Sequence, residues 1–123
     1  MKRFALPTAL VFAIVLTRHS QARPPYPSIF MKEYELNGEV IKLAKEAKCN
    51  VCHDAERNSK KDRNEYGKSL AKNLTANDFN NLKGVKPALA AKVSAALKAT
   101  EAEKNSEGKT YGEIIKSGKL PAK

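Results

Sequence analysis

The stretch Cys49-Asn50-Val51-Cys52-His53 decides how the rest of this 123-residue chain is interpreted. Its spacing is C-x-x-C-H, the pattern at which haem is attached covalently to a protein. Two thiols about one helical turn apart can both add to the vinyl groups of one porphyrin, and the next residue then lies beneath the ring. We therefore expect one covalently bound haem c, with thioethers at Cys49 and Cys52 and with His53 as the proximal iron ligand.

The first 22 residues have the composition of a secretory signal peptide. Their basic residues are Lys2, Arg3 and Arg18, and they contain no acidic residue. The apolar stretch over residues 4–16 is shorter than the roughly 20 residues that span a bilayer. Ser20 and Ala22 occupy the −3 and −1 positions of a cleavage site after Ala22. We expect export to the periplasm or the exterior and no membrane span after cleavage, with a retained N-terminal anchor as the alternative.

Three other interpretations of the motif compete with haem. A thioredoxin-like dithiol lies near a βαβ pattern, and this chain has no such pattern. A structural zinc site needs four ligands, whereas residues 23–123 supply only Cys49, Cys52 and His53. The remaining alternatives are a simple disulfide and a chance match to the motif, either of which is possible in any chain. The predicted export and the predicted all-helical pattern are both consistent with covalent haem attachment.

The charge balance predicts an acidic partner. The whole chain has a net charge of +10, and the part after residue 22 retains 20 basic and 13 acidic residues, a net charge of +7. In an exported haem protein such a charge favours docking to an acidic redox partner. Nucleic acid is not expected, because the compartment is wrong and the lysines are scattered. The lysines expected on exposed helix faces are Lys42, Lys45, Lys48, Lys92 and Lys98. The densest basic cluster, and the predicted docking edge, is Lys60, Lys61 and Arg63.

Residues 23–36 are predicted to form an extended N-terminal segment, because three prolines fall within its first five positions. Phe30, Met31 and Tyr34 form a small apolar group inside it. Over residues 23–123 the stock of apolar side chains larger than alanine is thin, so we expect a bound group to fill part of the core.

An all-α domain of about five helices is predicted for residues 37–123, since no stretch alternates at period two. The first helix begins at Asn37 as N-cap and runs into Cys49, and residues 54–64 form a polar surface loop. A second helix has an apolar face at Tyr66, Leu70 and Leu74, and the capping-box pair Thr75–Asp78 begins a short third one. Pro87 lies in the first turn of the next helix, whose apolar face is Leu89, Val93, Ala96 and Leu97 and which ends near Lys104. The capping-box pair Thr110–Glu113 begins the last helix, and Gly118 ends it.

The C-x-x-C-H motif at the end of a helix resembles that of a class I monohaem cytochrome c. The segments that are similar to small secreted monohaem cytochromes of planctomycete-type bacteria are Tyr66-Gly67-Lys68, Gly108-Lys109-Thr110-Tyr111-Gly112-Glu113 and Gly118-Lys119-Leu120-Pro121. The resemblance spans most of the chain after residue 22 and implies a small cytochrome c-like domain around one haem. Some relatives of this kind, including a nitric-oxide-binding cytochrome pair, use an unusual distal ligand.

The sequence leaves the second axial ligand of the haem iron undecided. A class I cytochrome usually supplies a methionine from a late loop, but no methionine follows Met31 in this chain. Met31 is therefore the candidate distal ligand, and a packing role is its alternative. The other outcomes are an open iron or a weak ligand such as a lysine amine, a tyrosine oxygen or an asparagine, with Lys119 the first lysine to test. Tyr66 and Tyr111 are expected to bond the haem propionates or to pack on the ring edge.

These residues predict a one-electron carrier, and two alternatives stay open. The first alternative is a protein that binds nitric oxide or carbon monoxide at an open or labile distal position, and the second is a haem subunit of a larger oxidoreductase, so a homo- or heterodimer is also open. An enzyme is not expected, because a peroxidase would want a distal acid–base group and His53 is the only histidine after His19.

Overall fold

The computed structural model describes residues 25–34, 38–57 and 61–121. The described part contains α-helices, one 3-10 helix and no β-strand, so the prediction of an all-α chain is confirmed. The helices are α1 (Pro25–Glu33), α2 (Gly38–Ala47), η1 (Lys48–Val51), α3 (Glu65–Asn73), α4 (Ala76–Leu82), α5 (Lys86–Glu101) and α6 (Tyr111–Lys116). The signal peptide predicted over residues 1–22 and the predicted N-cap Asn37 lie outside the described residues.

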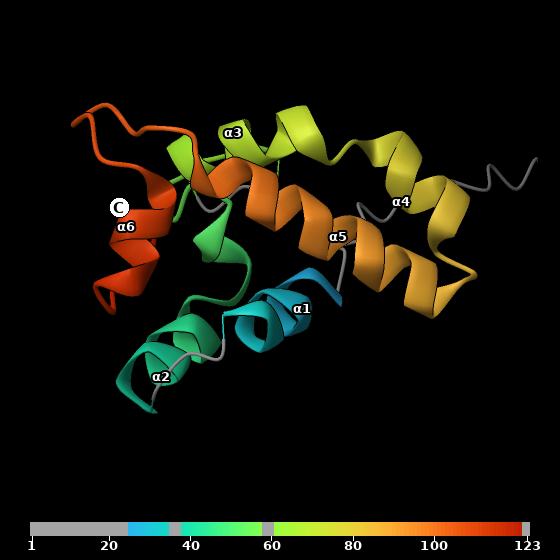
Figure 1. Cartoon of the computed structure of the whole chain (residues 1–123), viewed down its shortest axis with the longest axis horizontal. Helices are drawn as coiled ribbons and strands as arrows, with labels where there is room; N and C mark the ends of the chain where they lie inside the picture. Colours follow the sequence, from blue (N-terminus) through green and yellow to red (C-terminus); the bar gives the residue numbers. More distant parts are fainter. Residues whose placement is uncertain (1–24, 35–37, 58–60, 122–123) are drawn as a thin grey trace, which may run out of the picture.

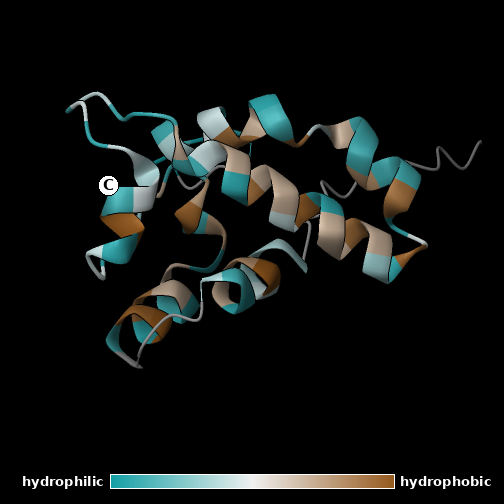
Figure 2. Ribbon diagram, in the orientation of Figure 1, coloured by the Kyte–Doolittle hydropathy of each residue, from teal (hydrophilic) through white to brown (hydrophobic). Residues whose placement is uncertain are grey.

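Helix α5 is the central element of the fold. It contacts α1, α3, α4 and α6, and Figure 1 shows it crossing the molecule with α3 and α4 along one side and α1 along the other. Its predicted apolar face is confirmed, because Leu89, Val93, Ala96 and Leu97 are all buried. Figure 2 shows that each helix carries both hydrophobic and hydrophilic residues, as expected for helices that bury one face each. One buried cluster therefore joins the helices on both sides of α5.

Both predicted capping boxes are present. Thr75 and Thr110 each accept a hydrogen bond from the backbone N–H three residues ahead, and Asp78 and Glu113 each bond back to the N-cap N–H. These reciprocal bonds satisfy N–H groups that have no partner inside the helix. Gly118 ends α6 as predicted, with a φ of 80°. The starts of α4 and α6 and the end of α6 thus follow directly from the local sequence.

Helix α5 ends earlier than predicted, at Glu101 rather than near Lys104. The Glu103 N–H bonds the carbonyl of Thr100 at 3.0 Å, and the Glu103 carbonyl accepts from Tyr111 at 3.0 Å. The chain after Glu101 is therefore tied to the start of α6 instead of continuing the helix. The described residues of the predicted 54–64 loop contain no helix or strand, which confirms that prediction.

The prediction of an extended segment over residues 23–36 is wrong, because residues 25–33 form α1. Its prolines, Pro25 and Pro27, both lie in the first turn. The N–H groups of the first turn have no intrahelical partner, so a proline there removes no hydrogen bond and its fixed φ suits the helix. Prolines would break the interior of a helix, but at the first turn of α1 they are compatible with helix formation.

Helix α1 also belongs to the same core as the predicted haem domain. Phe30 is buried in the core cluster, and the Tyr34 hydroxyl donates to the Leu97 carbonyl at 3.3 Å. Glu33 accepts a hydrogen bond from Ser94 and pairs with Lys98 at 3.3 Å. The boundary predicted near residue 36 therefore divides two segments that pack together on α5.

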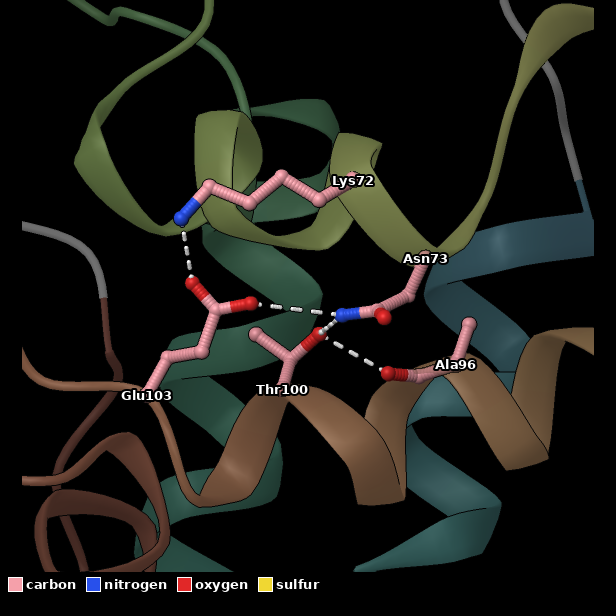
Figure 3. A network of polar contacts seen from close by, with 5 residues as sticks. All are labelled: Lys72, Asn73, Ala96, Thr100 and Glu103. Atoms are coloured by element: carbon pink, nitrogen blue, oxygen red, sulfur yellow. Dashed lines mark hydrogen bonds and ion pairs between the residues drawn. The ribbon is translucent and has the colours of Figure 1, made fainter.

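A polar network joins α3 to the C-terminal end of α5 (Figure 3). The hydroxyl of Thr100, a fully buried side chain, donates to the Ala96 carbonyl at 2.8 Å and accepts from the Asn73 amide at 3.2 Å. The same amide lies 3.4 Å from Glu103, which pairs with Lys72 at 2.7 Å. The bond from Thr100 to Ala96 is buried and the bond from Asn73 to Thr100 is partly buried, whereas the Lys72 side chain is 66% exposed. Buried hydrogen bonds should thus contribute more here than the ion pair does.

We expect Thr100→Val to lower the free energy of unfolding by about 1–2 kcal/mol, because the valine keeps the shape and loses two hydrogen bonds. Lys72→Ala removes the solvent-exposed ion pair and should cost less than about 1 kcal/mol. Urea unfolding followed by circular dichroism measures both variants. A larger loss for Lys72→Ala than for Thr100→Val would contradict this account of the network.

Candidate functional site

The C-x-x-C-H stretch, residues 49–53 (the 49–53 segment), follows α2 almost without a break. Helix α2 ends at Ala47, and Lys48 opens the 3-10 turn with a φ of 47°, in the left-handed region that a lysine rarely adopts. The Cys49 carbonyl then accepts from the N–H groups of Cys52 at 3.2 Å and His53 at 3.0 Å. The sharp change of direction at Lys48 thus separates the 49–53 segment from the helix that leads into it.

Both cysteine thiols are free and half-buried. They lie on one short turn, as the spacing predicted. Burial is the main reason why the pKa of the Cys52 thiol is raised to about 12; the neighbouring Cys49 adds to the effect and Arg63 opposes it. Cys52 is therefore a protonated thiol at neutral pH.

The imidazole of His53 is held by a backbone carbonyl. Its Nδ1 lies 3.1 Å from the carbonyl oxygen of Asp62. Since a carbonyl only accepts, Nδ1 carries the proton and donates, and the lone pair of the neutral ring is on Nε2. An antiparallel bridge between His53 and Arg63 holds the two chain segments together at this point. His53 therefore has the tautomer that an Nε2 ligand needs.

Helix α3 begins directly against the 49–53 segment. The Asn64 N–H donates to the Cys52 carbonyl at 3.1 Å, and the Asn64 side chain caps α3 by accepting from the Gly67 N–H at 2.8 Å. A Cβ added at Gly67 would lie 1.9 Å from the Cys52 carbonyl oxygen, so only glycine fits there. Sequence reasoning missed both residues as parts of the site. The available signal was an asparagine immediately before a helical run, a common N-cap pattern.

Tyr66 and Tyr111 lie side by side in the core. Their ring centroids are 5.0 Å apart, and Phe30 extends the cluster from Tyr66 at 6.1 Å. Burial is the main reason why the pKa values of both tyrosines are raised. Neither buried hydroxyl makes a hydrogen bond to another described residue, although Tyr34 lies near enough to the hydroxyl of Tyr66, and Ser69 to that of Tyr111, to affect its pKa. Cys52 is near enough to Tyr66 to contribute to its raised pKa, so Tyr66 lies in the neighbourhood of the 49–53 segment.

The two candidates for the distal position lie in different surroundings. Met31 is partly buried and packs against the core, on helix α1, which contacts η1. Lys119 is exposed and follows α6. The structure thus brings the helix that carries Met31 next to the turn that carries the cysteines, and iron ligation by Met31 stays a prediction.

Most of the predicted surface lysines are exposed. They are Lys42, Lys45, Lys48 and Lys98. Lys92 is only partly exposed and pairs with Asp78 at 3.6 Å. Of the predicted docking edge, Lys61 and Arg63 are exposed, and Lys60 lies outside the described residues. The bridge from His53 to Arg63 places this edge directly beside the histidine.

The described residues contain neither a candidate metal cluster nor a helix that could span a membrane. No three side chains of histidine, cysteine, aspartate or glutamate come together there as a group that could hold a metal ion. No helix in the described ranges has the length and apolar character needed to cross a membrane.

Comparison with known proteins assigns no family to the chain. No protein-family model matches it, and neither a curated protein nor a solved structure does.

We expect Gly67→Ala to lower the free energy of unfolding by about 3 kcal/mol, because the added methyl group forces α3 away from the Cys52 carbonyl. Gly84→Ala is the matched control, since a Cβ at Gly84 meets no atom within 4 Å. That control should be neutral or raise stability by about 0.5 kcal/mol. Equal effects of the two substitutions in urea unfolding would show that the close approach at Gly67 does not exist.

Proposed function

We propose that the chain is a small exported c-type cytochrome that carries one haem c and transfers single electrons. The observation that carries this proposal is the fixed imidazole of His53, whose Nδ1 donates to the Asp62 carbonyl at 3.1 Å. The ring directly follows two free thiols at the spacing of covalent haem attachment. A thiol pair alone would fit several functions, whereas a thiol pair followed by a histidine with its Nε2 lone pair available fits a haem best.

Three residues would hold the group. Cys49 and Cys52 would form the thioethers, and His53 would bind the iron through Nε2. When bound, the haem supplies reversible one-electron chemistry at its iron. The hydrogen bond from Nδ1 to the Asp62 carbonyl makes the imidazole a stronger electron donor and fixes the plane of the ring. The chain therefore contributes a defined proximal side from its own backbone.

The buried hydroxyls of Tyr66 and Tyr111 support the same proposal. Each is a donor without a partner in the described part of the chain. A haem carries two propionate carboxylates, which accept hydrogen bonds from tyrosines. These two residues are thus the proposed haem-pocket residues beyond the 49–53 segment.

An acidic protein is the proposed electron-transfer partner. Arg63 is exposed and bridges to His53, and Lys61 is exposed two residues before it. Positive charge beside the redox centre speeds the encounter with a negatively charged partner and orients it. We propose that the partner docks at this edge, in the periplasm or outside the cell.

The proposal predicts that the haem stays with the polypeptide when the protein, produced in a host that exports and attaches haem, is denatured and extracted with acidified solvent. Replacing both cysteines, Cys49→Ala with Cys52→Ala, should release all of the haem. Asn50→Ala is the matched control, because Asn50 is exposed in the same segment and has no thiol. Haem that leaves the unaltered polypeptide under these conditions would refute covalent attachment.

Met31 is the proposed distal ligand, and its substitution separates the electron carrier from the gas binder. Met31→Ala should abolish the thioether-to-iron absorption band, convert the oxidised protein to a high-spin spectrum and let the reduced protein bind carbon monoxide. Ile29→Ala is the control, since Ile29 is also partly buried on α1 and packs on the same core. An unchanged low-spin spectrum of Met31→Ala would exclude Met31 as ligand. Carbon monoxide binding by the unaltered protein would favour the gas-binding alternative.

A further inference from the structure

The side chain of Asn64 faces three backbone carbonyls of the 49–53 segment. Its amide nitrogen Nδ2 lies 3.1 Å from the carbonyl oxygen of Asn50 and 3.1 Å from that of Val51. The His53 carbonyl lies 3.3 Å from the same nitrogen. An amide has two N–H groups, so these acceptors share two donors. One side chain therefore serves three residues of a segment that lies 11 to 14 positions earlier in the chain.

The backbone around Asn64 completes the set. The Asn64 N–H donates to the remaining inner carbonyl, that of Cys52, at 3.1 Å. The first carbonyl of the segment, that of Cys49, accepts from the N–H groups of Cys52 and His53. Every carbonyl from residue 49 to residue 53 thus has a donor, and four of the five depend on Asn64. Backbone carbonyls that lie partly out of water need such partners, so the conformation of the segment depends on this residue.

The other end of the same amide fixes the side chain. Its Oδ1 accepts from the Gly67 N–H at 2.8 Å and caps helix α3. Asparagine alone combines this acceptor with two donors at the required length: aspartate lacks the donors, and serine is too short and has one. The chemistry of the position therefore requires both halves of an amide.

We propose that Asn64 is a positioning residue of the haem site: it holds the 49–53 segment in the conformation that its two thiols and its imidazole need. The inference rests on the proposed function. Asn64 acts through the backbone of other residues. Its removal should loosen the segment even where helix α3 stays capped.

Two substitutions separate the two roles of Asn64. Asn64→Ser keeps an N-cap acceptor of similar quality and loses the reach to the carbonyls. Asn64→Asp keeps the side-chain length and the N-cap acceptor. It replaces the amide Nδ2 with a carboxylate oxygen, which faces the carbonyl oxygens of Asn50, Val51 and His53 and cannot donate to them. One variant is neutral and the other is charged, so a shared effect cannot come from charge. The matched control is Thr75→Ala, which removes the N-cap of α4 and touches none of the five carbonyls.

Site-resolved amide hydrogen exchange on the full chain is the first measurement. In both Asn64 variants the N–H groups of Cys52 and His53 should exchange about tenfold faster. The amides of Lys68 in α3 and of Leu74 at its C-terminal end should keep their protection, because the cap remains. In Thr75→Ala, Cys52 and His53 should stay at wild-type rates. Wild-type protection of Cys52 and His53 in both Asn64 variants would overturn the proposal, and so would a loss confined to α3.

The second measurement is the fraction of purified chain that carries covalent haem. It should fall severalfold in both Asn64 variants and stay unchanged in Thr75→Ala. If the unaltered protein carries no haem, the proposed function has failed, and hydrogen exchange still decides whether Asn64 holds the segment. If the unaltered protein carries haem and both Asn64 variants carry as much, the proposed function stands and the role of Asn64 is refuted.

Discussion

The structure depends on one close approach, that of the first turn of α3 to the carbonyls of the 49–53 segment. A short 3-10 turn cannot satisfy its own polar backbone, because few of its groups find partners inside it. Asn64 supplies the donors, and Gly67 leaves room for the Cys52 carbonyl to lie against the helix. The turn that carries the thiols is thereby attached to α3, which packs on α5 and so on the rest of the core.

The imidazole of His53 is fixed by the same arrangement. Asp62, shortly before α3, places its carbonyl oxygen beside Nδ1, and the Asp54 N–H donates to the same oxygen at 3.1 Å. The carbonyl of Asp62 thus supports the proximal side of the proposed haem site. A polar residue that no sequence motif marks, Asp62, therefore fixes the orientation of the imidazole.

Much of the fold could be predicted from local signals, because those signals act over three or four residues. The capping pairs at Thr75 and Thr110 begin helices as expected, and the apolar face with Tyr66, Leu70 and Leu74 is buried. The error over residues 23–36 has the same local origin. Prolines give the same signal in an extended chain and in a first helical turn, and only the packing of Phe30 against the core decides between them.

The site itself could be predicted only in part. The C-x-x-C-H spacing identifies two thiols and an imidazole, but no sequence pattern predicts that an asparagine 11 residues after His53 donates a hydrogen bond to the His53 carbonyl. Such a contact depends on how the loop between them folds, and an amide that caps a helix can in principle serve any neighbouring backbone. The role of Gly67 is equally hidden, because its contact with the Cys52 carbonyl depends on tertiary structure.

The hydroxyls of Tyr66 and Tyr111 are buried and make no hydrogen bond within the described part of the chain. A buried donor without a partner costs about 1–3 kcal/mol, and phenylalanine at either position would keep the ring packing without that cost. A small domain has little stability to spare, so an acceptor from outside the polypeptide is the simplest reason for two such hydroxyls. A porphyrin carboxylate is such an acceptor. The two hydroxyls and the oriented imidazole of His53 thus support the proposed haem independently of one another.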